Sequence, residues 1–574
     1  MIHYTVRFTQ PHRHFISFEA AFPHDGSPVL RFQLPSWRPG RYELGLFARN
    51  IRSWRSTAAD GRPLAFSKFS RDGWEVQAEG EQEVRIFYEY YAAELNAGST
   101  YLDAEQLYIN PVNCFFYLPG RDALGYHIAF ELPDAYKIAS GLEHLEKHVL
   151  RATSFDQLAD CPLIASASLR HLHYRCRDVD FSIWIQGEHR IDEDALLRQF
   201  EAFTAVQIDA FGGFPVKEYH FLFQFTPYFV RHGVEHTNST VIAMGPVADF
   251  LNEAWYERML GISSHELYHT WNVKSIRPVE MQPYRFDVEN YSRLGYVAEG
   301  VTTYYGDLML RRAGLISNEA ILDIFSRHLD EHFNNPGRHH LSVADSSLDT
   351  WLDGYVAGIP GRKVSIYNEG CLIAWICDGG IMQATEGERS LDDVMRLMYE
   401  RFGLTGKGFT DSDYRSVVEE VAGRSMDDVF SRLVHGTSDY TPFLERTIHL
   451  LGLEWKVERT SRWSEAALGF SVDESGSRML VTDVVSDSPA DRAGLWLDDE
   501  IVTVNGFAPY KNIQHLLRMH SGRAIVLGIM RKYRHAEVTL HDDGHVWRTR
   551  HTLAMPASFA PANHRYWQKW IGGA

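Results

Sequence analysis

The segment GISSHELYHTWN, residues 261–272, holds two histidines four positions apart, with a glutamate directly after the first. Residues i and i+4 of an α-helix lie about 40° apart around its axis, so His265 and His269 can share one metal ion. Glu266 lies about 100° from His265, which suits a general base that acts on a metal-bound water. This HExxH pattern is typical of catalytic zinc sites. The alternative is an exposed helical face with partly solvated histidines.

A third ligand is available thirty residues after His269. Glu299 lies in YVAEGVTTYYGDL, which predicts a helix, and its neighbours Val297 and Val301 indicate a buried face. A buried carboxylate needs a partner, and two histidines with one glutamate leave a coordination position open for water. A solvated helix residue is the alternative for Glu299. Thr303 stands four residues beyond it, so no partner that orients a ligating histidine is evident.

Upstream of the histidines, HGVEHTNST places Glu235 after a strand. This segment resembles the gluzincin aminopeptidases, and above all the pattern GG-x-EH-x-NS of the glycyl aminopeptidase family (metallopeptidase family sixty-one), with His232 in place of the first glycine. SWRPGRYELGLFARNI and EGVTTYYGDLML are also similar to that family. The resemblance implies a Zn²⁺-dependent aminopeptidase that prefers Gly or Ala as the first residue. It implies that Gly233, Val234 and Glu235 bind the substrate, with Glu235 on its free α-amino group.

The same resemblance assigns a role to Tyr367 in SIYNEGCLIAW, 68 residues after Glu299. In the gluzincin aminopeptidases a tyrosine in such a segment stabilises the tetrahedral oxyanion, and a phenol donor suits a developing negative charge. The family's lysine in this segment is missing here. The alternative is a tyrosine at a helix start that packs against Trp375.

The last hundred residues resemble a PDZ domain. Leu468, Gly469 and Phe470 are expected to form a loop whose backbone N–H groups bind a peptide C-terminus. The ordered elements SPADRAG and EIVTVNG support the resemblance. This module either recruits chains by their C-termini or packs on the catalytic domain, and both alternatives stay open.

These residues must be held by a multidomain α+β chain. Strand-forming segments such as HFISFEAAF fill the first 170 residues, and helical periodicity dominates from about 190 to 455. The histidine helix is expected from about Asn252 to Trp271. The predicted domains are a β-rich N-terminal domain (1–170), a thermolysin-like catalytic domain with a helical region (171–455), a PDZ domain (456–545) and a tail (546–574) that packs back through its Trp and Tyr residues.

Composition narrows the function classes. The 574 residues include 57 Lys and Arg against 75 Asp and Glu, a formal charge of −18, which disfavours nucleic acid or an anionic membrane as a partner. None of the five cysteines forms a CxxC pair, so they are expected to be buried free thiols. No stretch predicts a membrane span or a signal peptide, and a cytoplasmic location is expected, or a periplasmic one if a leader was removed.

The sequence therefore predicts a zinc metallopeptidase that hydrolyses peptides with a free N-terminus through a metal-activated water. Two alternatives remain. One is a zinc endopeptidase that uses its PDZ domain to recruit substrates. The other is a PDZ peptide-binding scaffold whose metal site is inactive.

Overall fold

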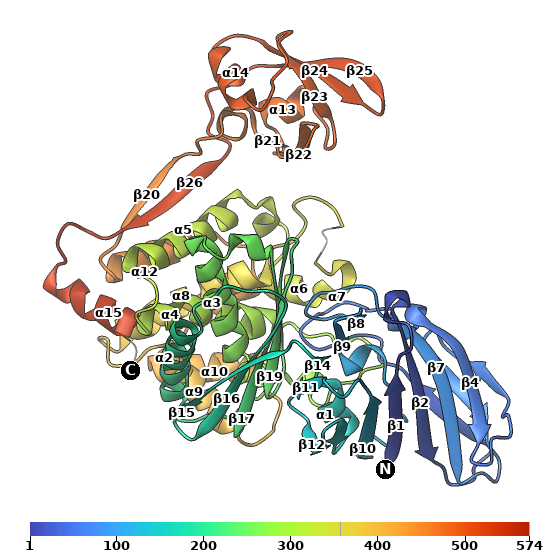
Figure 1. The fold of residues 1–574 in the computed structure, drawn as a ribbon. Coiled ribbons are helices and arrows are strands. Elements are labelled where there is room, and N and C mark those ends of the chain that lie inside the picture. The colour runs from blue at the N-terminus through green and yellow to red at the C-terminus, as the bar shows by residue number, and fades with distance from the viewer. Residues whose placement is uncertain (356–357, 573–574) are drawn as a thin grey trace.

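The computed structural model describes residues 1–355 and 358–572. Figure 1 shows a sheet-rich N-terminal part, a mainly helical central part and a small C-terminal part at the end of a two-stranded stalk. Each part has its own hydrophobic core. This arrangement confirms the predicted mixed α+β architecture and the order of its parts.

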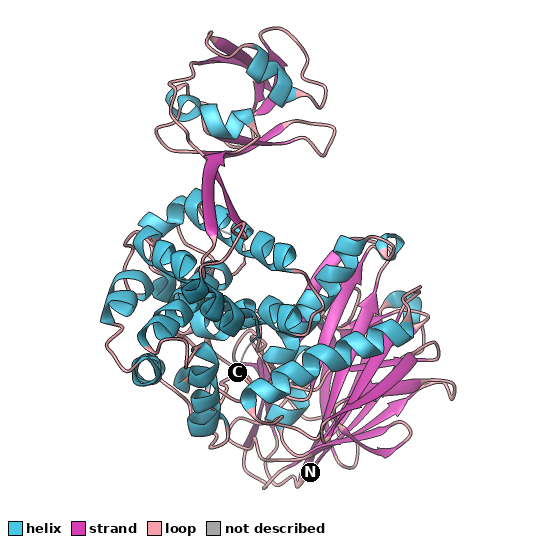
Figure 2. Cartoon of the chain, turned by 90° about the vertical axis from the view of Figure 1, so that its left-hand side faces the viewer, coloured by secondary structure: helices cyan, strands magenta, loops and turns pink. Residues whose placement is uncertain are grey.

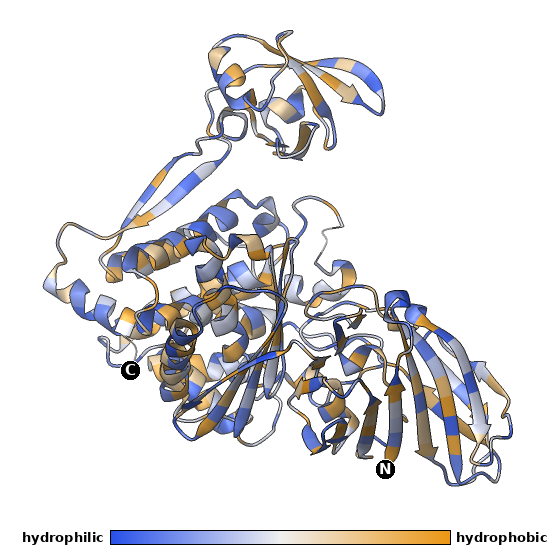
Figure 3. Cartoon of the chain, viewed as in Figure 1, coloured by the Kyte–Doolittle hydropathy of each residue, from blue (hydrophilic) through white to orange (hydrophobic). Residues whose placement is uncertain are grey.

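Alternating burial organises the N-terminal part. Its elements are β1 (Ile2–Arg7), β2 (Phe15–Pro23), β3 (Val29–Gln33), β4 (Ile51–Ala58), β5 (Phe66–Lys68), β6 (Gly73–Gln77), β7 (Glu83–Tyr91), β8 (Tyr101–Leu102), β9 (Gln106–Ile109), β10 (Tyr126–Glu131), β11 (Lys137–Ser140), β12 (Glu143–Glu146), β13 (Val149–Ala152), α1 (Phe155–Ala159) and β14 (Leu163–Ser166). Every second side chain of β2 is buried, and Figure 3 shows such strands banded in apolar and polar colours. The sheets run β12-β13-β10-β1-β2-β7-β4, β11-β14-β9-β8 and β3-β6-β5.

The central part combines one sheet with a group of helices (Figure 2). Its elements are β15 (Arg170–Cys176), β16 (Val179–Gln186), α2 (Glu193–Phe211), β17 (Glu218–Phe225), β18 (Val230–Glu235), β19 (Ser239–Gly245), α3 (Glu253–Tyr268), α4 (Thr302–Arg312), α5 (Asn318–Asn334), α6 (Val343–Leu348), α7 (Thr350–Asp353), α8 (Ile366–Ala384), α9 (Leu391–Met398), α10 (Asp411–Ala422), α11 (Asp427–Val429) and α12 (Thr441–Leu450). The sheet order β15-β16-β17-β19-β18 leaves β18 at an edge.

The predicted helices of the central part are confirmed, and local sequence explains their bounds. Asp192 caps α2, whose end is set by Gly212 at φ 77°. Asn252 caps α3 by accepting a hydrogen bond from the N–H of Ala254. The α-helical part of α3 ends at Tyr268, three residues before the predicted end.

The C-terminal part stands on a stalk that the sequence analysis did not predict. Its elements are β20 (Glu454–Arg459), β21 (Phe470–Asp473), β22 (Leu480–Val484), α13 (Pro489–Arg492), β23 (Glu500–Val504), α14 (Ile513–Met519), β24 (Ile525–Arg531), β25 (Arg534–Leu540), β26 (Thr549–Ala554) and α15 (Pro561–Gly572). Strand β20 pairs antiparallel with β26, which places the module between them away from the central part (Figure 1). The partner strands are about ninety residues apart, and no local pattern indicates such a pairing.

The tail returns to the central part, as its aromatic residues predicted. Trp567 and Trp570 of α15 are buried in the central core, and the Trp570 indole N–H donates to the hydroxyl of Tyr304 over 2.8 Å. Residues 573–574 of the predicted tail lie outside the described residues.

Two further expectations are met within the described ranges. All five cysteines are free and buried. No helix there has both the length and the apolar composition that crossing a membrane requires.

Candidate metal centre

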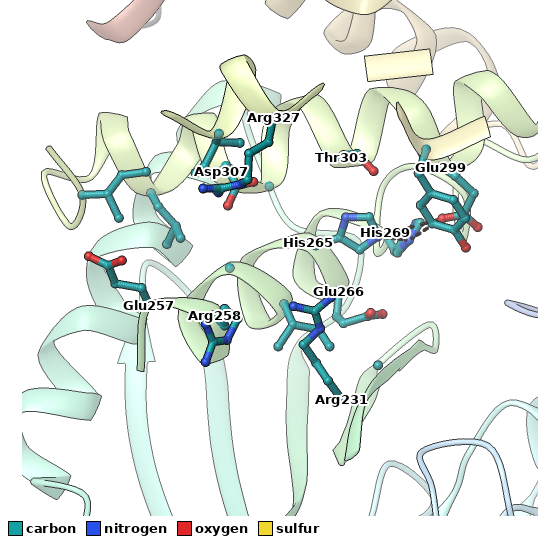
Figure 4. A pocket seen from close by; sticks show the side chains of 18 of the residues that line it. Arg231, Glu257, Arg258, His265, Glu266, His269, Glu299, Thr303, Asp307 and Arg327 are labelled. Atoms are coloured by element: carbon teal, nitrogen blue, oxygen red, sulfur yellow. Dashed lines mark hydrogen bonds and ion pairs between the residues drawn. The ribbon is translucent and has the colours of Figure 1, made fainter. Parts of the chain in front are cut away.

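The three predicted ligands converge at the end of α3. His265 lies in the last turn of the helix and His269 directly follows it, with their Nε2 atoms 3.1 Å apart. The Oε2 atom of Glu299 lies 3.9 Å from Nε2 of His265 and 3.4 Å from Nε2 of His269 (Figure 4). The three side chains thus point at one common volume.

Their spacing fits a zinc ion. Zinc bonds of about 2.0–2.2 Å in a tetrahedron put neighbouring ligand atoms about 3.4 Å apart, and the three observed distances lie around that value. The Nδ1 atom of His269 lies 2.8 Å from the backbone oxygen of Asn272. A proton on Nδ1 donates to that oxygen, so the Nε2 lone pair is free for a metal.

The charge of the site also calls for a cation. Glu235, Glu266 and Glu299 are all at most 5% exposed. Burial alone would lower the pKa of His269, but the carboxylates of Glu299 and Glu235 raise it to about 10. Burial raises the pKa of Glu266 well above its ordinary value, and Glu235 and Glu299 raise it further. Three buried carboxylates beside two imidazoles therefore leave an excess of negative charge, which a bound cation would neutralise.

Two of these carboxylates have an oxygen without a partner. Oε2 of Glu266 and Oε1 of Glu235 are buried and accept no hydrogen bond from any described residue. Buried polar atoms are nearly always paired, so unpaired ones beside a cavity point to a ligand. Glu235, Glu266 and His269 also form a second group whose ligand atoms lie within 4.8 Å of one another.

The edge strand β18 brings Glu235 to the centre. Strand alternation turns Gly233 and Glu235 toward the cavity, whereas Val234 is buried on the other face beside Val241. Gly233 lies so close to Glu266 that a Cβ atom there would overlap the Glu266 carboxylate. Of the three residues predicted to bind substrate, the Val234 side chain therefore lies outside the cavity.

A close helix crossing brings Tyr367 near Glu299. The predicted helix around Glu299 begins instead as a π-helical turn, Tyr296–Val301, before α4. A Cβ atom on Gly370 would lie 2.5 Å from the Tyr296 oxygen and 2.6 Å from Gly300 Cα, so only glycines allow α8 to pack this closely. Such π-helical turns are frequent at functional sites.

The position and the pKa of Tyr367 suit a hydrogen-bond donor. It lies at the start of α8, its ring centre is 6.4 Å from that of His265, and its hydroxyl lies 3.5 Å from the hydroxyl of Tyr355. Burial and the nearby Glu299 carboxylate raise its pKa well above the ordinary value. The phenol therefore keeps its proton at neutral pH.

The N-terminal part also reaches the site. The hydroxyl of Tyr42 donates to Oε1 of Glu299 over 3.2 Å. Gly40, at φ 79°, lies against Glu235, and a Cβ there would come within 2.5 Å of Oε2 of that residue. The buried guanidinium of Arg38 lies 3.3 Å from Nε2 of His232, which is three residues before Glu235 on β18.

One cavity of about 890 Å³ is lined by the three proposed ligands together with Gly40, Glu235, Glu266 and Tyr367. Figure 4 shows it between α3 and β18 on one side and α4 and α5 on the other. The proposed zinc ligands, an unpaired carboxylate and a protonated phenol around one cavity suit the hydrolysis of a carbonyl compound.

Comparison with known families decides the identity. The profile of the Peptidase M61 N-terminal domain matches residues 3–167, that of M61 glycyl aminopeptidase matches residues 258–373, and that of the PDZ domain matches residues 456–522. The chain belongs to the M61 peptidase family. It is a metallopeptidase, and the C-terminal module is a PDZ domain.

One solved structure has the same fold over the whole chain. An aminopeptidase N family protein from Idiomarina loihiensis is 22% identical, with a TM-score of 0.91, over 99% of this chain and 100% of that chain. A mutant M1 zinc metallopeptidase from Deinococcus radiodurans, bound to a Tyr-Ser-Ala substrate, is 13% identical, with a TM-score of 0.46, over 76% of this chain and 94% of that chain. No match was found among curated proteins.

In this M61 peptidase the predicted PDZ loop, residues 468–470, lies in the C-terminal module, far from the metal centre (Figure 1). Leu468 and Phe470 are buried in the module's core, and Gly469 at φ 73° accepts a hydrogen bond from the N–H of Val485. Strand β21 is an edge strand, and the guanidinium of Arg462 donates to the oxygen of Val472 on it over 2.6 Å. The chain itself thus occupies one acceptor of the edge where a peptide would add.

Sequence reasoning missed the residues from the N-terminal part. The segment SWRPGRYELGLFARNI indicated only a likeness to the family, although Tyr42 within it is 4% exposed and donates to Glu299. The only signal was chemical: an aromatic residue beside glycine and arginine, within a segment shared with the family. It also missed Asn272, whose oxygen orients His269 from three residues away.

Replacing Tyr42 with phenylalanine should weaken zinc binding about tenfold while leaving the fold intact. The variant removes only the hydroxyl that fixes Glu299, and loss of such an orienting partner typically costs about 10- to 100-fold in metal affinity. Competition with a chromogenic chelator measures the zinc Kd. Tyr88→Phe, which removes a buried hydroxyl donating to Cys114, is the matched control and should bind zinc as the native protein does. Native zinc affinity in Tyr42→Phe would rule out this orienting role.

Proposed function

We propose that this M61 peptidase is a zinc aminopeptidase that removes small N-terminal residues, Gly or Ala, from peptides. The position of Glu235 carries the proposal. It is a buried carboxylate beside the metal centre with one oxygen unpaired among the described residues, and the N-terminal part stands directly against it.

His265, His269 and Glu299 would hold the metal, as their convergent atoms support. When bound, zinc supplies Lewis acidity that polarises a carbonyl oxygen and lowers the pKa of a water molecule. Asn272 and Tyr42 hold two of these ligands in orientation through their hydrogen bonds.

Glu235 would pair with the ammonium group of the substrate. A cation of that kind satisfies its unpaired oxygen and reduces the surplus of negative charge around it. Gly40 packs against the same carboxylate, so the N-terminal part would limit the space beyond the ammonium group. Both features favour cleavage one residue from the N-terminus over cleavage within a chain.

Glu266 and Tyr367 would carry the proton transfers and the charge stabilisation. Glu266 takes a proton from the attacking water on its unpaired Oε2 and gives it to the leaving amine. The Tyr367 hydroxyl donates to the carbonyl oxygen as negative charge develops there. The raised pKa of Tyr367 supports the donor role.

A small first residue agrees with the crowding at this end. Burial raises the pKa values of Tyr42 and Tyr355, and the charges of Glu299 and Glu235 raise them further. Gly40 lies against the Glu235 carboxylate, so it would limit the space for a bulky side chain next to the ammonium group.

The proposed division of labour follows the proposed domains. Residues 1–170 close the cavity, 171–455 carry the chemistry, 456–545 form the PDZ domain, which would bind a peptide C-terminus, and 546–574 anchor the chain end. Of the alternatives, an endopeptidase needs chain on both sides of the scissile bond, which the contact of Gly40 with Glu235 opposes.

The test is hydrolysis of aminoacyl p-nitroanilides. We expect turnover of Gly and Ala p-nitroanilide, slower turnover of the Phe compound, and at least a hundredfold loss when the amino group is acetylated. Removal of the metal with 1,10-phenanthroline should stop the reaction, and added zinc should restore it. Comparable cleavage of acetylated substrates would instead indicate an endopeptidase. Peptide binding without turnover would indicate a scaffold.

A further inference from the structure

We propose that Arg231 and Arg258 bind the C-terminal carboxylate of the substrate, so that the preferred substrates are free tri- and tetrapeptides. The proposal rests on the proposed aminopeptidase function, because it takes Glu235 as the anchor of the substrate's ammonium group. It assigns opposite charges to the two ends of one cavity.

Strand β18 and helix α3 run in the same direction along the cavity. On the strand, Gly233 lies against Glu266 of the helix. Two residues further along the strand, Glu235 lies beside His269, which is three residues further along the chain than Glu266. Arg231 and Arg258 precede these residues on the two elements, so both lie at the end away from Glu235. Both line the cavity.

Chain geometry gives the length of the peptide that would reach from Glu235 to the two arginines. Residues 231, 233 and 235 share one face of β18, and each step of two residues spans about 6.6 Å, so Arg231 starts about 13 Å from Glu235. Arg258 lies seven residues before His265, or about 10 Å along α3. An extended peptide covers about 3.3–3.6 Å per residue, so the carboxylate of a third or fourth residue reaches this end.

The two guanidinium groups are available for a ligand. Arg231 and Arg258 are exposed, and neither forms an ion pair or donates a side-chain hydrogen bond within residues 1–355 and 358–572. Arg327 on the opposite wall, by contrast, pairs with Asp323 one helical turn away. Two unpaired guanidinium groups on one wall match the fork of a carboxylate.

The acidic residues of the cavity do not cancel this charge. Asp323 is occupied by Arg327, and burial raises the pKa of Asp307 to about 6. Glu257 is exposed, and in Figure 4 its carboxylate points away from Arg258 and Arg231. The basic end of the cavity is therefore formed by the wall that also carries Glu266 and Glu235.

The test compares peptide acids with peptide amides. Calorimetry with zinc-loaded Glu266→Gln protein measures binding of Ala-Gly-Gly and Ala-Gly-Gly-Gly against their C-terminal amides, so it needs no turnover. We expect the acids to bind about tenfold more tightly. In Glu266→Gln protein that also carries Arg231→Gln and Arg258→Gln, the ratio should fall toward one. Arg198→Gln, an exposed and unpaired arginine on α2 outside the cavity, should keep the ratio.

Kinetics separate this inference from the proposed function. Native enzyme that cleaves Ala p-nitroanilide but binds acids and amides equally would overturn the carboxylate site while leaving the aminopeptidase intact. A length series should peak at three to four residues, and a rate that rises steadily to octapeptides would also overturn it. An acid preference without any hydrolysis of Ala p-nitroanilide would support the carboxylate site and contradict the proposed function.

Discussion

Replacing Glu266 with glutamine should lower kcat by roughly 10²- to 10⁴-fold, the usual contribution of a general base or acid. Glutamine has nearly the same shape but cannot accept the proton of the attacking water. The three proposed ligands are untouched, so the variant should keep its zinc. The measurement is kcat for Ala p-nitroanilide together with zinc content by atomic emission.

The stability of this variant provides a second readout. Glu266 is 5% exposed, and burial raises its pKa well above the ordinary value, so its charged form is costly in the folded protein. A neutral glutamine should therefore give an equal or higher Tm, which excludes unfolding as the cause of lost turnover. Glu201→Gln on the exposed face of α2 is the control. Turnover of Glu266→Gln within threefold of native would exclude the role of base.

The parts of the site that sequence analysis predicts are those set by local geometry. His265, Glu266 and His269 stand on one helix, whose period alone brings them together. Tyr367 was assigned by family resemblance, and its placement depends on contact between Gly300 and Gly370, seventy residues apart. No local sequence pattern predicts that contact.

The parts that sequence analysis missed depend on packing between distant segments. Tyr42 reaches Glu299 across 257 residues of chain, and its segment has the composition of an ordinary turn. The fold itself was more predictable, because strand alternation and helical periodicity are local, but the β20–β26 pairing was not. Tertiary packing therefore brings Tyr42 to Glu299 and Gly40 to Glu235, and the proposed substrate choice depends on these contacts.

Replacing Glu235 with glutamine should reduce kcat/KM for Ala p-nitroanilide by about 10²-fold or more. Removing one partner of a buried charge pair costs about 2–5 kcal/mol, and here the substrate ammonium group would lose its only proposed carboxylate. The loss should be far smaller for substrates that lack the ammonium group, such as the acetylated compounds. Equal losses for both kinds of substrate would contradict the anchoring role.

Gly40→Ala offers a variant that displaces the Glu235 carboxylate without removing it. A Cβ at position 40 would lie 2.5 Å from Oε2, and the φ of 79° adds backbone strain. We expect a loss in kcat/KM between those of the native protein and Glu235→Gln, with KM rising more than kcat falls. A kcat/KM equal to that of the native enzyme would show that the carboxylate can shift freely and does not set the substrate's position.

Zinc content then decides between two roles for Glu235. Its carboxylate belongs to a second group of possible ligands, with Glu266 and His269, beside the group His265, His269 and Glu299. If Glu235 anchors the substrate, Glu235→Gln binds one zinc per chain with native affinity, and Glu299→Gln loses it. If Glu235 is itself a ligand, Glu235→Gln loses zinc and Glu299→Gln binds it with native affinity. The ammonium group would then bind elsewhere in the cavity.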